Sequence, residues 1–269
     1  MSDIDSLHIL QTLLMAQESA DAVVLATIIK ARGSVPRHAG TKMLVYADGR
    51  FIGTIGGGEL EARVLQAAQK CLTTNQPTIL PYSLVDPQRG DPGVCGGEVE
   101  VYLEPYLPPA TVFVIGCGHV GKQVAALSHW LGYRVVVYDD RSALVTAENI
   151  PDADVYLSGT FTEAVAANPL HRQTFVTMVT RNVAVDRKII PHLVASPAPY
   201  IGIMGSRRRW SETRRQLLDD GLSQDQLERF HVPIGLELQA ESPQEIALSI
   251  LAEITQLRRS AAEAANVEE

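Results

Sequence analysis

The hydrophobic positions in the second half of the chain follow two alternating periods. Thr111–Ile115 is a run of apolar and β-branched residues, as expected of a buried parallel strand. From 119 to 131 apolar residues recur three or four positions apart, which predicts a helix, and Arg134–Tyr138 predicts the next strand. The same alternation predicts strands at 154–157, 174–180 and 200–204 and helices at 161–167, 185–194, 205–220, 223–230 and 242–257. This order indicates a Rossmann-type parallel sheet.

The first half of the chain has a mixed pattern that predicts a small α/β domain. An amphipathic helix is expected over residues 4–15, with an apolar face formed by Ile4, Leu7, Leu10 and Leu14. Strands are expected at 22–29 and 78–83, a hairpin at 42–46 and 50–54, and a helix at 60–72. Val99–Glu104 alternates apolar and polar residues, so we expect an edge strand there.

A proline-rich connector separates these two patterns. Residues 105–110 contain three prolines, which favour a stiff, extended backbone. We therefore predict an N-terminal α/β domain at 1–104, a linker at 105–110 and a Rossmann-type domain at 111–269. The last residues, 260–269, are expected to be frayed.

Composition narrows the class of protein. Among 269 residues, 46% are hydrophobic and 20% are charged, as in soluble globular proteins, and the net charge of −8 argues against general nucleic-acid binding. No apolar run approaches the roughly 18 residues of a membrane span. The N-terminus shows no signal-peptide core, and the three cysteines form no C-x-x-C pair. We expect a cytoplasmic protein with free thiols.

The strongest chemical signal is the G-x-G-x-x-G sequence of residues 116–121. In a dinucleotide site, Gly116 makes the turn, Gly118 lets the backbone approach a pyrophosphate, and Gly121 lets the helix pack closely. The helix that begins near His119 offers free N–H groups to phosphates. Asp139, eighteen residues after Gly121, is placed to accept ribose hydroxyls. The alternative is a scaffold whose glycines serve packing alone.

Three further segments are candidates for binding. Gly56, Gly57 and Gly58 precede a helix, which fits an anion cradle or a flexible turn. Ser206, Arg207 and Arg208 begin a helix with Arg209, and cations there oppose the helix dipole, which suggests a bound anion. Solvated charges or salt bridges to Asp139 or Asp140 are the alternatives. Cys95 lies in the Gly/Pro-rich loop 86–97, either as a reactive thiol or as a small buried residue. The scattered histidines argue against a structural zinc site.

Together these segments resemble the xanthine dehydrogenase accessory family (XdhC/CoxI) over nearly the whole chain. The resemblance is carried by Gly33–Arg37 with Gly40, Gly53–Glu61, Cys95–Gly97, Gly116–Gly121, Tyr200–Arg208, His231–Gly235 and Ala240–Ala247. It implies a small N-terminal α/β domain, a C-terminal Rossmann domain and a homodimer.

The resemblance also implies a function as a molybdenum-cofactor chaperone without turnover of its own. Such a protein binds the molybdopterin or its dinucleotide form, presents it to a sulfurase, and helps insert it into a molybdoenzyme client of the xanthine-dehydrogenase or CO-dehydrogenase type. Its phosphates would be held by the glycine-rich segments 56–58 and 116–121 and by Arg207 and Arg208. Further anion contacts would come from Arg32 and Arg37, and a thiolate at Cys95 would ligate molybdenum.

One segment departs from the family pattern. Family members often carry a Thr-His-Asp-His-like run where this chain has Thr180–Val183, although Asp186 is retained nearby. The loss of histidines weakens a proton-transfer or metal role at this strand end. Two other functions fit the Rossmann loop, an NAD(P)-dependent oxidoreductase and a nucleotide-sensing module. For either, we predict NAD over NADP, because the carboxylate of Asp139 favours a free ribose hydroxyl and repels a 2′-phosphate, a repulsion that Arg141 nearby could offset.

Overall fold

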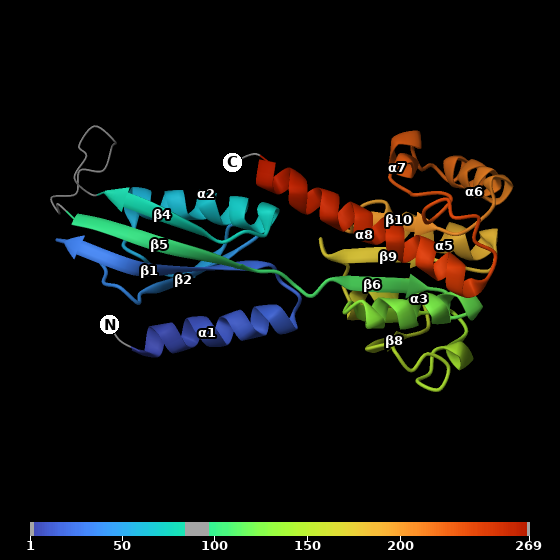
Figure 1. Ribbon diagram of the computed structural model, residues 1–269, viewed down its shortest axis with the longest axis horizontal. Coiled ribbons are helices and arrows are strands. Elements are labelled where there is room, and N and C mark those ends of the chain that lie inside the picture. The colour runs from blue at the N-terminus through green and yellow to red at the C-terminus, as the bar shows by residue number, and fades with distance from the viewer. Residues whose placement is uncertain (1–2, 84–96, 268–269) are drawn as a thin grey trace. The chain divides into compact units, whose positions relative to one another are not determined.

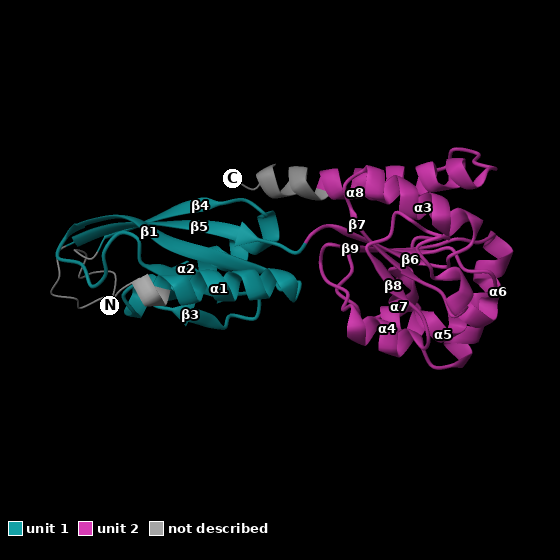
Figure 2. Ribbon diagram, turned by 90° about the horizontal axis from the view of Figure 1, so that it is seen from below, with its two compact units in different colours: residues 1–108, 262–269 teal, residues 109–261 magenta. Residues whose placement is uncertain are grey.

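The computed structural model describes residues 3–83 and 97–267, with side chains at 6–83 and 97–260. The chain forms two compact units, residues 1–108 with 262–269 and residues 109–261 (Figure 2). None of the helices in these described ranges combines the length and apolarity needed to cross a bilayer.

Unit 1 is built on a five-stranded antiparallel sheet with the order β3-β2-β1-β5-β4 (Figure 1). Its elements are α1 (Asp3–Glu18), β1 (Val23–Gly33), β2 (Lys42–Tyr46), β3 (Phe51–Gly53), α2 (Gly58–Thr74), β4 (Thr78–Ser83) and β5 (Gly97–Tyr106). Strand β5 pairs with both β1 and β4, so it is an inner strand and the predicted edge position is wrong. Alternation reports that one strand face is buried, and it does not report how many neighbours the strand has.

The predicted N-terminal helix forms, but it turns a different face to the sheet. Its buried residues are Ile9, Leu13 and Ala16, whereas Leu7 and Leu14 are 58% and 65% exposed. Ile9 and its neighbours pack on Leu25 and Leu44 of the sheet. Because α1 carries apolar residues around most of its circumference, its periodicity did not define the buried face.

Unit 2 is a parallel sheet with the order β10-β9-β6-β7-β8. Its strands are β6 (Thr111–Ile115), β7 (Arg134–Tyr138), β8 (Val155–Leu157), β9 (Thr174–Met178) and β10 (Tyr200–Ile203). Its helices are α3 (His119–Trp130), α4 (Phe161–Ala167), α5 (Val183–Leu193), α6 (Arg207–Asp219), α7 (Gln224–Glu228) and α8 (Pro243–Val267), with a 3-10 turn at Ser142–Leu144. This is the strand order of a Rossmann sheet, which confirms the predicted fold class.

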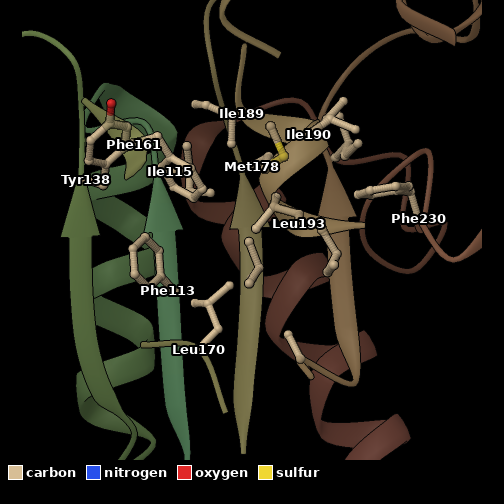
Figure 3. Close-up of a cluster of buried hydrophobic side chains, with 14 of the residues drawn as sticks. Phe113, Ile115, Tyr138, Phe161, Leu170, Met178, Ile189, Ile190, Leu193 and Phe230 are labelled. Carbon is tan, nitrogen blue, oxygen red and sulfur yellow. The ribbon is translucent and has the colours of Figure 1, made fainter. Parts of the chain in front are cut away.

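Helices cover both faces of this sheet. On one face, Phe113, Met178 and Leu193 belong to a buried cluster (Figure 3). Helices α4, α5, α6 and α7 contribute residues to the same cluster. On the other face, Val124 of α3 and Ile250 of α8 pack against Val112 and Val135. Helix α8 continues to Val267, so it includes most of the segment that was expected to be frayed. The alanines of residues 261–265 favour helix and explain the longer element.

Strand β10 is held in place by residues that follow it in the chain. The segment at His231 forms a parallel bridge with Gly202, and Glu253 of α8 accepts a hydrogen bond from the Tyr200 hydroxyl. Arg229 donates to four backbone carbonyls between α5 and β10, those of Leu193, Val194, Ser196 and Ala198. The turn before β10 and the strand itself therefore depend on the last part of unit 2.

Candidate functional site

Two glycines of the 116–121 turn are required by close packing. A Cβ on Gly121 would lie 1.8 Å from the carbonyl oxygen of Gly116, and one on Gly116 would lie 2.7 Å from that of Val179. Gly116 also has a φ of 114°, which disfavours other residues. Gly118 differs, because its φ is −82° and a Cβ there would meet no atom within 4 Å. The fold does not need a glycine at 118, and the open space leaves room for a ligand.

The N-terminus of α3 begins beside this open space. Gly118 is the N-cap, no side chain caps the helix, and its first turn contains no acidic residue. By contrast, Asn182 caps α5 and Ser206 caps α6 through their side chains. His119, the first residue of α3, is exposed. The first-turn N–H groups and the positive end of the dipole are thus left for an anion.

Asp139, at the end of β7, ties the glycine turn in place. The Cys117 N–H donates to Asp139 Oδ2 at 2.9 Å, and Arg141 donates to both carboxylate oxygens at 2.8 Å. Asp139 is only 3% exposed. Burial alone would raise its pKa, but the bonds from Arg141 and Cys117 outweigh burial and lower the pKa to about 2. Both oxygens are engaged, so a ribose could reach them only after Arg141 moves away.

Cys117 is a structural residue of the same turn. Its thiol is buried, and burial together with the charge of Asp139 raises its pKa to about 12. A thiol with this pKa stays protonated near neutral pH and is a poor nucleophile.

An ion pair lies across the carboxyl edge of the sheet. Arg181, after β9, donates to both oxygens of Asp140, after β7, at 2.6 and 2.8 Å. Strand β6 lies between β9 and β7, so this pair crosses the end of β6. The crevice lined by Gly116, Tyr138–Arg141, Thr180 and Arg181 has a volume of about 10 Å³, enough for about one water molecule.

A buried network next to this crevice was not predicted. Arg209 donates to Asp186 Oδ2 at 2.6 Å, and to the carbonyl and hydroxyl oxygens of Thr180 at 3.0 and 2.7 Å. Thr180 in turn donates to Asp186, which is fully buried. The network links the starts of α5 and α6 to the end of β9. In the sequence, only the presence of Asp186 shortly after Thr180–Asn182 pointed to this network.

The side chains of the three arginines at the start of α6 therefore point in different directions. Arg209 faces inward, whereas Arg207 and Arg208 are exposed, and neither has an ion pair within the described part of the chain. The salt bridges to Asp139 and Asp140 that we considered for this run are made by Arg141 and Arg181 instead. Ser206 is occupied as the cap that accepts from the Arg209 N–H.

In unit 1, the triple-glycine turn already holds an anion of its own. Gly56, Gly57 and Gly58 have φ angles of 136°, 79° and 63°. The N–H groups of Ile55 and Gly57 donate to Glu61 Oε1 at 3.3 and 3.0 Å, and the Thr54 hydroxyl donates to the same oxygen. A carboxylate of α2 thus occupies the position that we assigned to an external anion.

The remaining residues predicted to bind the cofactor are Arg32, Arg37 and Cys95, which precede the Rossmann turn in sequence. Arg32 is exposed on β1, which extends to Gly33, beyond the end of the strand expected at 22–29. Arg37 is half-buried in the turn that follows. Cys95 lies outside the described residues. Within the described residues, no group of three or more His, Cys, Asp or Glu side chains is arranged to hold a metal.

Comparison with known proteins identifies related chains. Residues 112–254 match the XdhC Rossmann domain, and residues 16–83 match the XdhC and CoxI family. The uncharacterized protein YqeB of Escherichia coli (strain K12) is 34% identical over 88% of this chain, which spans 44% of the length of YqeB.

Two further comparisons cover almost the whole chain. The molybdenum cofactor insertion chaperone PaoD of Escherichia coli (strain K12) is 21% identical over 94% of this chain and 89% of PaoD. A crystal structure of a xanthine dehydrogenase from Bacillus halodurans has a TM-score of 0.50 at 23% identity, covering 94% of this chain and 96% of that one. At this identity the structure supports the fold alone.

Proposed function

Because the chain belongs to the XdhC/CoxI family, we propose that it is an accessory protein that binds the molybdenum cofactor and assists its sulfuration and insertion into a molybdoenzyme. The relative named as a molybdenum cofactor insertion chaperone supports this assignment. The proposed partners are a client of the xanthine-dehydrogenase or CO-dehydrogenase type and a sulfurase, with the chain acting as a homodimer without turnover of its own.

The observation that carries the proposal is the open N-terminus of α3. Molybdopterin and its dinucleotide forms carry phosphate groups, which need N–H donors and positive charge. The uncapped first turn of α3 supplies both, and the empty space at Gly118 allows the phosphate to approach the backbone. Arg207 and Arg208, exposed at the start of α6, supply cations from the same sheet edge. In the proposed complex the cofactor brings the molybdenum chemistry, while these residues bind and orient its phosphate.

The test measures retention of the cofactor by the purified full chain. The protein is incubated with molybdenum cofactor or with NAD(H) and desalted, and bound molybdenum, pterin and nicotinamide are quantified. We expect molybdenum and pterin to be retained. Gly118→Val places a side chain in the open space with an allowed backbone, so it should reduce retention at least about tenfold while the free energy of unfolding falls by only about 1 kcal/mol. Ala166→Val, which introduces the same side chain on the exposed side of α4, is the control.

Two results would contradict the proposal. Full retention by Gly118→Val would remove the α3 turn from the binding site. Retention of nicotinamide nucleotide alone would favour the oxidoreductase or the nucleotide sensor. Cys95→Ser tests the thiolate separately: we expect it to abolish cofactor loading with the fold intact, and normal loading would exclude Cys95 as the molybdenum ligand.

A further inference from the structure

The Arg181–Asp140 pair closes the place where ligands enter sheets of this type. In open parallel sheets, ligands bind outside the carboxyl ends of the strands, at the point where the strand order reverses. Here that point lies between β6 and β9. The bidentate pair extends from the end of β9 to the end of β7, and the crevice it borders has room for about one water molecule. A ligand can fill this crevice only when the pair opens.

The pairs at this edge differ in how firmly they are held. The carboxylates of Asp139 and Asp186 are 2% and 1% exposed, and each also binds another group of the turn that it stabilises. In contrast, the side chains of Arg181 and Asp140 are 39% and 40% exposed. Solvent-exposed ion pairs contribute little to stability, so Arg181 can exchange its partner at small cost, whereas Arg141 and Arg209 cannot.

A phosphate group is a suitable replacement for the Asp140 carboxylate. It presents oxygens to the guanidinium in the same bidentate geometry and carries at least as much negative charge. Asp140 meanwhile repels an anion that approaches the end of β6. The pair therefore holds a cation ready for a phosphate and also lowers the affinity for that phosphate.

We propose that Arg181 is an anion-binding residue of this crevice, that Asp140 occupies it in the unliganded protein, and that a phosphate group of the ligand displaces Asp140. Only the identity of the natural ligand rests on the proposed function. The exchange itself requires a pyrophosphate or phosphate group of any source.

The test measures binding of inorganic pyrophosphate to the full chain by calorimetry at low ionic strength. Asp140→Asn should tighten binding by about fivefold, since it releases Arg181 and removes a repelling charge. Arg181→Gln should weaken binding at least about tenfold, through loss of a charge-assisted contact. In the double variant the Asp140 substitution should have less effect, because the release of Arg181 no longer contributes and only the removal of the repelling charge remains.

Asp220→Asn is the matched control. Asp220 forms an exposed bidentate pair with Arg187, between α5 and α6, and its substitution changes the net charge by the same amount. It should leave pyrophosphate affinity unchanged. Equal effects of Asp140→Asn and Asp220→Asn, or unchanged binding by Arg181→Gln, would overturn the proposal.

The outcome is separable from that of the proposed function. If the variants shift pyrophosphate binding as expected while the protein retains no pterin, the cofactor assignment fails and the role of Arg181 stands. If the pterin is retained but the variants at 140 and 181 leave pyrophosphate binding unchanged, the role of Arg181 fails and the cofactor assignment stands.

Discussion

The two glycine turns of this protein, one in each unit, resemble each other in sequence and differ in what they can bind. Each leads from a strand into a helix, α2 in unit 1 and α3 in unit 2. At the first turn, the carboxylate of Glu61 accepts from the N–H groups of Ile55 and Gly57. At the glycine turn of unit 2, the N-terminal residues of α3 include neither an acid nor a side-chain cap. Asp139 accepts there only from the N–H of Cys117.

The difference shows that glycines before a helix are not sufficient for an anion site. They provide a backbone that can turn its N–H groups toward one point, but a nearby carboxylate can occupy that point permanently. In unit 1 the carboxylate comes from the helix itself, whereas in unit 2 it comes from the next strand and leaves the helix terminus free. The residues of the first helical turn therefore matter as much as the glycines.

The largest expected loss of stability comes from replacing a glycine of the α3 turn with alanine. Gly121→Ala should lower the free energy of unfolding of unit 2 by about 3 kcal/mol or more, because its Cβ overlaps a backbone carbonyl that cannot move freely. Gly118→Ala should cost about 1 kcal/mol or less, since its Cβ enters empty space. Hydrogen exchange in unit 2 under increasing urea measures both. Equal losses would mean that Gly118 also serves packing.

Asp139→Asn should have the next largest effect. The native pKa is about 2 and the ordinary value is 3.8, so the carboxylate contributes about 2 kcal/mol above pH 4, and this contribution is lost as the pH falls from 4 toward 2. The stability difference between the parent and the variant should therefore shrink across this range. Unfolding measured from pH 5 to pH 2 tests this. A stability difference independent of pH would contradict the role assigned to the ionised Asp139.

The smallest loss of stability should come from removing the carboxylate that fills the glycine turn of unit 1. Glu61→Ala should cost about 1 kcal/mol in chloride, because two N–H groups lose their acceptor. Sulfate should restore part of this loss by binding the vacated turn. Glu59→Ala, which removes a pair with Arg63, controls for the general stabilisation by sulfate. Equal sulfate responses of the two variants, in thermal unfolding, would show that the turn binds no anion even when open.

The Rossmann unit could be predicted because its sequence signals agree with one another. The buried run at 111–115, the glycines, the helix and the next strand all indicate one arrangement, and the structure confirms it. The N-terminal helix shows the opposite case. Its apolar residues include Leu7 and Leu14 as well as Ile9 and Leu13, so the pattern is compatible with two buried faces, and the predicted face is the exposed one.

The contacts of the candidate site could not be predicted, because they depend on side-chain direction. The sequence placed three arginines at the start of α6, but only the rotation of the helix determines that Arg209 faces Asp186. It likewise placed Asp139 at the end of β7 without showing that Arg141 turns back onto it. The glycine pattern of 56–58 could not show that Glu61, three residues later, would accept from the turn.

The way β10 is secured has a consequence for the order of events during synthesis. Arg229 caps the turn before this strand, His231 bridges its outer edge, and Glu253 binds Tyr200. All three follow β10 in the chain, so they leave the ribosome after the strand does. Until then, a nascent chain carries a strand with an open edge, which is prone to pair with other chains. Unit 2 can therefore close its sheet only after the chain has been made as far as Glu253.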